Sequence, residues 1–300
     1  MTTPLRRPSL LWVLLLGPLS CASGPTTPEA AEPPRPAPEA STDSPRSGAT
    51  DLARVVLAEP VAITPHALAG ALGNWGLAGA TQIQEQEGVI TFELEGAIGA
   101  VGVMGAPIPW TDLEGPAEAA FMWPKAAEVL RPHGAHVIVS LLRAPGSSIE
   151  RKLWLTRLVA AVVEATGALG VYWGDGPAVH EASTFVGMAR EASAEAPPMP
   201  LWLGLSLARP DGGRLSLLTF GMEELGHKNL LVQGRDGNAA LAFTFDIARY
   251  IVAEDARIAH GHTVGHSPTQ RIAVEHRPSP VDPGETVIAI DLPDDFGSEP

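Results

Sequence analysis

The histidines are the residues whose spacing most suggests chemistry. His260, His262 and His266 fall in the string HGHTVGH. If this segment is extended, the three side chains share one face, and imidazoles two residues apart on a strand can bind Zn²⁺ or Cu²⁺. Gly261 and Gly265 are equally typical of an exposed loop, and no cysteine or carboxylate stands nearby at a recognised metal-site spacing. We therefore predict no cofactor, and a metal site at these histidines remains an alternative to the loop.

A second group of histidines precedes an apolar segment. His133 and His136 flank the entry to a predicted strand, where His136 would be able to act as a general base with Glu118 or Glu128 as its partner. A histidine at a strand entry can equally serve structure alone, by donating a hydrogen bond to a backbone carbonyl. Both interpretations stay open, and we treat His133 and His136 as candidate binding residues.

The string GMEELGH places acidic side chains beside an imidazole. Glu223, Glu224 and His227 form a possible acid–base group, but Met222 and Leu225 indicate that the same turn anchors itself in the core. Other reactive signatures are missing, because the chain has no G-x-S-x-G nucleophile motif and no phosphate-binding glycine loop. Glu223 and His227 are therefore candidates for binding rather than for catalysis.

Tryptophan offers a large contact area with one hydrogen-bond donor, so it is common in ligand grooves and protein interfaces. Trp110 and Trp123 are the candidates for such a role. The alternative for these two, and for Trp173 and Trp202, is burial in the core beside apolar runs. The charge balance adds a constraint on partners: 34 acidic and 20 basic residues give a net charge of -14. No basic face is available for nucleic acid, so we expect no nucleic-acid partner.

The start of the chain resembles a bacterial lipoprotein precursor. Arg6 and Arg7 precede a short apolar run that ends before Cys21, the single cysteine, and Ser20 is the small residue expected before a lipidated cysteine. This resemblance implies an exported protein that is held on a membrane, with the outer membrane indicated by Ala22. The alternative is ordinary cleavage after Ala22, which would remove Cys21.

Composition divides the rest of the chain into a linker and a head. Residues 1–21 form the predicted signal, and residues 22–50 are rich in proline with nothing large to bury, so we predict a disordered linker. A globular head is expected over residues 51–292, followed by an acidic, frayed tail over 293–300.

The elements that must position the candidate residues follow from periodicity. Strands are predicted over 54–59, 81–87, 89–95, 97–104, 135–142, 168–173, 201–208 and 214–220. Helices are predicted over 65–75, 116–130 with an interruption at Pro124, 147–166 and 179–194. Hairpins at both ends disfavour a doubly wound parallel sheet. We predict an α+β fold with mixed, largely antiparallel sheets covered by helices, in what could be two similar halves.

Several strings of the head are similar, in order, to a family known as a domain of unknown function (DUF4261). They are PIPW at 107–110, WP at 123–124, HGAH at 133–136, ALGVYWG at 168–174, PLW at 200–202 and TFGMEELGHKNL at 219–230. The resemblance implies a fold unit and assigns no activity.

Taken together, the sequence favours a membrane-tethered head that binds a ligand or an envelope protein without chemistry. Two alternatives remain. One is a hydrolase or metalloenzyme that uses His133, His136 and His227 or the HGHTVGH histidines, and the other is an immunity-like protein that neutralises a toxin by contact.

Overall fold

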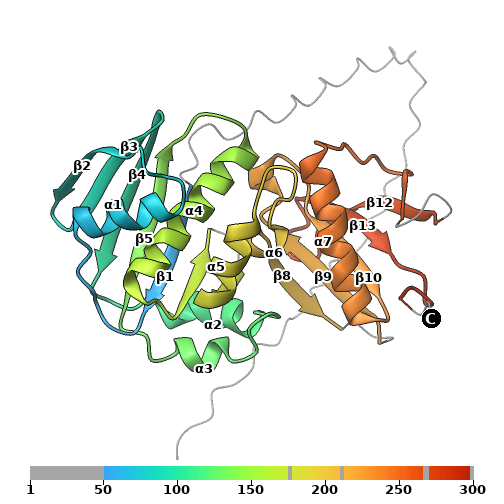
Figure 1. Ribbon diagram of the computed structural model, residues 1–300. Coiled ribbons are helices and arrows are strands. Elements are labelled where there is room, and N and C mark those ends of the chain that lie inside the picture. The colour runs from blue at the N-terminus through green and yellow to red at the C-terminus, as the bar shows by residue number, and fades with distance from the viewer. Residues whose placement is uncertain (1–50, 175–177, 210–212, 266–269, 298–300) are drawn as a thin grey trace, which may run out of the picture. The chain divides into compact units, whose positions relative to one another are not determined.

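The described chain contains two β-sheets, one in each half (Figure 1). The computed structural model describes residues 51–174, 178–209, 213–265 and 270–297. The predicted signal, Cys21, the linker and His266 lie outside these residues. Among the described helices, none is both long and apolar enough to cross a membrane.

The first sheet has seven strands in the order β2-β3-β4-β5-β1-β6-β7, and every neighbouring pair is antiparallel. Its strands are β1 (Asp51–Leu57), β2 (Thr81–Gln86), β3 (Val89–Leu94), β4 (Ala97–Met104), β5 (Ala135–Arg143), β6 (Gly170–Trp173) and β7 (Ala178–Glu181). The hairpins come from local signals. Glu95 and Gly96, both with positive φ, make the turn between β3 and β4, as the sequence predicts.

Helices cover both faces of this sheet. They are α1 (Pro65–Asn74), α2 (Trp110–Glu118), α3 (Ala126–Leu130), α4 (Ser148–Thr166) and α5 (Ala182–Glu191). Side chains alternate along β1, so that Val55 lies in the core with α4, whereas Val56 packs in a second cluster with residues of α2 and α3. Helix α4 begins at a capping box between Ser147 and Glu150 and ends at Gly167, whose φ of 62° suits glycine.

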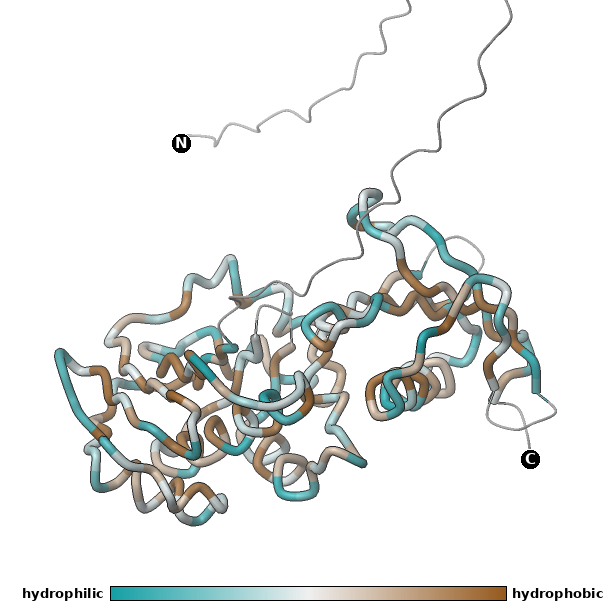
Figure 2. Tube along the Cα trace, turned by 90° about the horizontal axis from the view of Figure 1, so that it is seen from above, coloured by the Kyte–Doolittle hydropathy of each residue, from teal (hydrophilic) through white to brown (hydrophobic). Residues whose placement is uncertain are grey.

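The second sheet has six strands in the order β11-β12-β13-β10-β9-β8, and β10 with β13 is the one parallel pair among the described strands. The elements of this half are α6 (Met199–Trp202), β8 (Gly204–Ala208), β9 (Leu215–Phe220), the 3₁₀ turn η1 (Glu223–Leu225), β10 (Leu230–Gly234), α7 (Gly237–Ala253), β11 (Thr263–Val264), β12 (Ile272–Pro278) and β13 (Thr286–Asp291). Helix α7 is capped by Asp236 and packs on one face of the sheet. Figure 2 colours parts of the helix and of the sheet strands as hydrophobic.

The predicted α+β class is confirmed, but several element predictions are wrong in part. The helix predicted over 116–130 is two helices, because α2 begins already at Trp110 and ends at Glu118, and α3 begins only at Ala126. The helix predicted over 179–194 begins only at Ala182, because Val179 and its neighbours pair with β6 as the edge strand β7. The strand predicted over 201–208 begins only at Gly204, because Pro200 stands in the first turn of α6.

The acidic tail is not frayed over its described part. The Asp294 carboxylate pairs with Arg214 and with Arg235, the latter at 2.8 Å. The Phe296 ring meets the Phe243 ring of α7 edge-on, with 5.3 Å between centroids. Ion pairs and an aromatic contact therefore hold the chain against α7 as far as Gly297.

Candidate functional site

The loop before α2 is held in place by the two histidines of HGAH. His133 is 5% exposed, and both its ring nitrogens are bonded to backbone. Its Nε2 accepts the Ile108 N–H at 2.8 Å, and its Nδ1 donates to the Leu130 carbonyl at 2.6 Å. An imidazole used in this way has no free nitrogen for a ligand. His133 thus joins this loop to the end of α3.

His136 contacts the same loop but keeps one nitrogen available. Its Nδ1 donates to the Ala106 carbonyl at 2.9 Å, so Nε2 carries the lone pair, and the structure gives Nε2 no partner among the described residues. Burial lowers the pKa of His136, and the nearby Arg54 and His133 lower it further against the bond to Ala106. The side chain is therefore a neutral hydrogen-bond acceptor at pH 7.

A pocket of about 270 Å³ opens beside the start of α2, on the face of the first sheet that α2 and α3 cover. The residues that line it are Arg54, Ile108, Pro109, Asp112, His136, Tyr172 and Gly174. They come from β1, the loop before α2, α2 itself, β5, and β6 with the turn after it. The Arg54 guanidinium lies over the Tyr172 ring, 5.5 Å from its centroid, and this contact fixes the arginine at the pocket wall.

Charge is the property that distinguishes this pocket. Arg54 and Asp112 both line it, yet neither is within 4.0 Å of an oppositely charged group in the described parts of the chain. Helix α2 begins at Trp110 without a side-chain cap, so its first N–H groups add partial positive charge at the same wall. The arrangement is suited to binding a small ligand that carries a negative group.

The two tryptophan candidates do not line the pocket. Trp123 is 7% exposed and packs in the cluster under α2 and α3, close enough to Gly170 that a Cβ there would meet its ring at 2.8 Å. Trp110 donates from Nε1 to Glu114 at 2.8 Å, and Arg131 stacks on its ring at 4.5 Å from the centroid. Both therefore support the helices that form one wall.

The GMEELGH turn lies in the second half, apart from this pocket. Glu223 accepts hydrogen bonds from the Gly221 N–H and from the Asn229 side-chain amide, and Glu224 pairs with Lys152 of α4. Desolvation of its carboxylate raises the pKa of Glu223. These carboxylates thus bind the turn to its surroundings.

His227 ends the same turn, with its side chain 5% exposed and Nε2 3.6 Å from Asp255. Burial lowers the pKa of His227, Arg257 lowers it further, and Asp255 opposes the shift. His227 is therefore neutral near pH 7 and does not share a site with His136.

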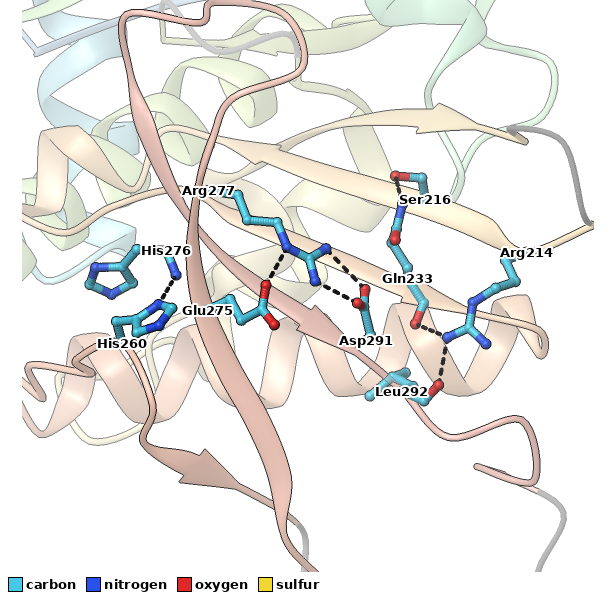
Figure 3. Close-up of polar contacts among 9 residues, drawn as sticks. All are labelled: Arg214, Ser216, Gln233, His260, Glu275, His276, Arg277, Asp291 and Leu292. Carbon is cyan, nitrogen blue, oxygen red and sulfur yellow. Dashed lines mark hydrogen bonds and ion pairs between the residues drawn. The ribbon is translucent and has the colours of Figure 1, made fainter.

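His260 and His262 each use one ring nitrogen to accept a hydrogen bond from a backbone N–H. Nδ1 of His260 accepts the His276 N–H at 3.1 Å, and Nδ1 of His262 accepts the Ala259 N–H at 3.2 Å (Figure 3 shows the His260 bond). Over the residues that the structure describes, no group of three or more histidine, cysteine or acidic side chains could hold a metal ion. Since His266 is not described, the metal site at the three histidines stays a prediction.

Arginines fasten the outer strands of the second sheet. Figure 3 shows Arg277 of β12 between Glu275, at 2.8 Å, and Asp291 of β13, at 2.7 Å. Arg214 donates to the Leu292 carbonyl at 2.6 Å. The guanidinium groups of Arg277 and Arg214 are partly exposed and already bonded. They hold strands together and are not available to a ligand.

Sequence reasoning missed Arg54, Asp112 and Tyr172. Arg54 offers a signal in retrospect, because it is the one charged residue in the apolar string LARVVL, and strand alternation puts it opposite to Val55. Asp112 and Tyr172 carry no comparable signal, since only the packing of α2 against β1 and β6 brings them to the same pocket.

Comparison with known proteins bears on the second half of the chain. No curated protein and no solved structure matches it. One family model does match, over residues 218–291, which run from β9 to the end of β13 and contain the whole string TFGMEELGHKNL. The other strings that suggested the family, and the pocket beside α2, lie outside the matched segment. Residues 218–291 are thus similar to the family described as Domain of unknown function (DUF4261).

Proposed function

We propose that this protein is an exported lipoprotein whose head binds a small ligand with an anionic group in the pocket beside α2, without transforming it. The observation that supports the proposal is that distant parts of the sequence meet at this pocket. The strings PIPW, HGAH and ALGVYWG are far apart in the sequence, and each contributes lining residues to this one pocket. A small pocket with a few convergent polar groups is the usual form of a ligand site.

Arg54 is the group expected to bind the anion. A guanidinium held on an aromatic ring, with no carboxylate in ion-pair range among the described residues, keeps its donors available for a ligand carboxylate or phosphate. The partial charge at the start of α2 acts in the same direction.

The distribution of the other candidate groups favours binding over catalysis. His136 is in the pocket, but Glu118 and Glu128 do not line it, and both nitrogens of His133 are already bonded. His227 is in the other half of the head. Catalysis by a nucleophile or an acid–base pair needs such groups within hydrogen-bond reach of each other.

Replacing Arg54 by glutamine is expected to weaken anion binding about tenfold to a hundredfold. The change removes a charge-assisted hydrogen bond of roughly 1.5–3 kcal/mol while it keeps a polar side chain. The full-length protein would be tested against acetate, propionate, succinate, inorganic phosphate and the standard L-amino acids by thermal shift, and any ligand found would be taken to calorimetry.

Arg143→Gln is the matched control, because Arg143 is an exposed arginine at the far end of β5 and does not line the pocket. Arg54→Lys should retain part of the affinity. A ligand whose affinity is the same for the parent and Arg54→Gln, or a panel in which nothing binds, would contradict the proposed site.

The lipid anchor is tested separately at Cys21. Cys21→Ser should abolish the incorporation of labelled palmitate and should release the protein from the outer-membrane fraction, because two or more acyl chains are needed for stable attachment. Labelling that persists in Cys21→Ser, or that is missing from the parent, would remove lipidation from the proposal and leave the ligand site untouched.

A further inference from the structure

The pocket beside α2 contains a fixed negative charge as well as a positive one. Asp112 is exposed in the first turn of α2. Its carboxylate accepts a hydrogen bond from the neighbouring Thr111 hydroxyl at 3.3 Å. No lysine, arginine or histidine nitrogen of the described chain lies within 4.0 Å of it. A ligand with a cationic group would give this carboxylate a partner.

His136 adds a second acceptor at the same pocket. Its proton is on Nδ1, where it binds the Ala106 carbonyl, so Nε2 can only accept. A ligand N–H would satisfy this lone pair, whereas a carboxylate oxygen would not. The pocket therefore offers donors at Arg54 and acceptors at Asp112 and His136.

Arg54 and Asp112 both line the pocket, yet they form no ion pair with each other. A purely anionic ligand at Arg54 would also meet the field of Asp112, and a purely cationic one at Asp112 would meet that of Arg54. A ligand that carries both charges satisfies both residues, and a volume of about 270 Å³ restricts it to a small molecule. We propose that the ligand is a small zwitterion, of the class of free α-amino acids; this inference rests on the proposed function.

The test compares an amino acid with analogues that lack one of its charges. The L-amino acid that gives the largest thermal shift would be measured by calorimetry on the full-length protein, beside the analogue without the amino group and the analogue without the carboxylate. For alanine these are propionate and ethylamine. Each analogue is expected to bind at least tenfold more weakly than the amino acid.

Asp112→Asn gives the signature that a merely structural role would not produce. The substitution should weaken amino-acid binding tenfold or more, and it should leave the binding of the analogue without the amino group unchanged or tighter, because a repulsive charge is gone. Asp246→Asn is the matched control, an aspartate on a helix of the second half that pairs with Arg249.

The outcomes separate the two proposals. If simple carboxylates bind as well as amino acids, and Asp112→Asn affects both equally, the zwitterion is excluded while the anion site at Arg54 stands. If amino acids bind with the same affinity to the parent and to Arg54→Gln, the anion site itself is wrong.

Discussion

Replacing Lys152 by methionine is expected to lower the free energy of unfolding by about 3 kcal/mol, which is large against the 5–15 kcal/mol that is typical of a folded domain. The Lys152 side chain is 5% exposed. Its Nζ lies 3.0 Å from the Asp51 carboxylate at the start of β1, and it also contacts the Glu224 carboxylate of η1. This one ammonium thus joins three elements from both halves of the head.

The loss arises from the carboxylates that remain. Methionine fills the same space, but it leaves Asp51 and Glu224, whose side chains are 17% and 32% exposed, without their shared cation. Arg151 stays 3.6 Å from Asp51, and water screens Glu224 in part, so we expect the lower end of the range for broken buried ion pairs.

Urea denaturation followed by circular dichroism measures this effect. Lys228→Met is the control, since Lys228 is exposed in the turn after η1 and should change stability by less than about 0.5 kcal/mol. Combining Lys152→Met with Glu224→Leu should recover part of the loss. Equal stability of Lys152→Met and the parent would show that the ion pairs contribute nothing.

The second large effect is a loss of stability in acid that depends on His180. This residue of β7 is 3% exposed, and burial lowers its pKa from 6.5 to about 4. Its Nε2–H donates to the Leu201 carbonyl at 3.1 Å, and Nδ1 is a buried acceptor without a partner in the described structure. A second proton would have to enter on Nδ1, where nothing can accept a hydrogen bond from it.

The sign follows from comparing the folded and unfolded chains. Below pH 6.5 the unfolded chain binds a proton at His180, whereas the folded chain stays neutral down to about pH 4. The stabilisation is therefore complete above pH 6.5 and is lost as the pH falls from 6.5 towards 4, by about 3 kcal/mol over this window.

His180→Gln isolates this contribution, because its amide can still donate to the Leu201 carbonyl and does not titrate. We expect the parent to lose about 3 kcal/mol more than His180→Gln between pH 7 and pH 4 in urea titrations. His66→Gln, at an exposed histidine of α1, should follow the parent. An imidazole signal of His180 that titrates above pH 6 by NMR would contradict the buried pKa even if the glutamine variant fails to fold.

Local signals account for much of the fold. The capping box at Ser147, the left-handed Gly167 and the cap at Thr64 define α4 and α1 from neighbouring residues alone, so the sequence predicts both helices closely. The prediction for residues 179–181 is wrong for the opposite reason. Their apolar spacing suits a helix, but pairing with β6 decides their structure, and this pairing is not visible in the local sequence.

The candidate site was less predictable than the fold. His136 could be chosen from its position before a strand, yet its orientation depends on the Ala106 carbonyl, which is 30 residues away in sequence. His133, chosen for the same reason, proves to have both nitrogens bonded to backbone. Arg54 and Asp112 acquire a shared role only through the packing of α2 on the sheet, and no periodicity in the sequence encodes that proximity.

The position of strand β1 determines how the head would respond to a force applied to the chain on its N-terminal side. The chain enters the fold at Asp51, directly into a strand that is hydrogen-bonded along both edges, to β5 and to β6. Tension on the chain before Asp51 would have to slide this strand past two neighbours at once and separate Asp51 from Lys152. A strand at the edge of a sheet would lose its hydrogen bonds one at a time under the same tension. The central position of β1 therefore makes the head resistant to unfolding by a force on its N-terminal side.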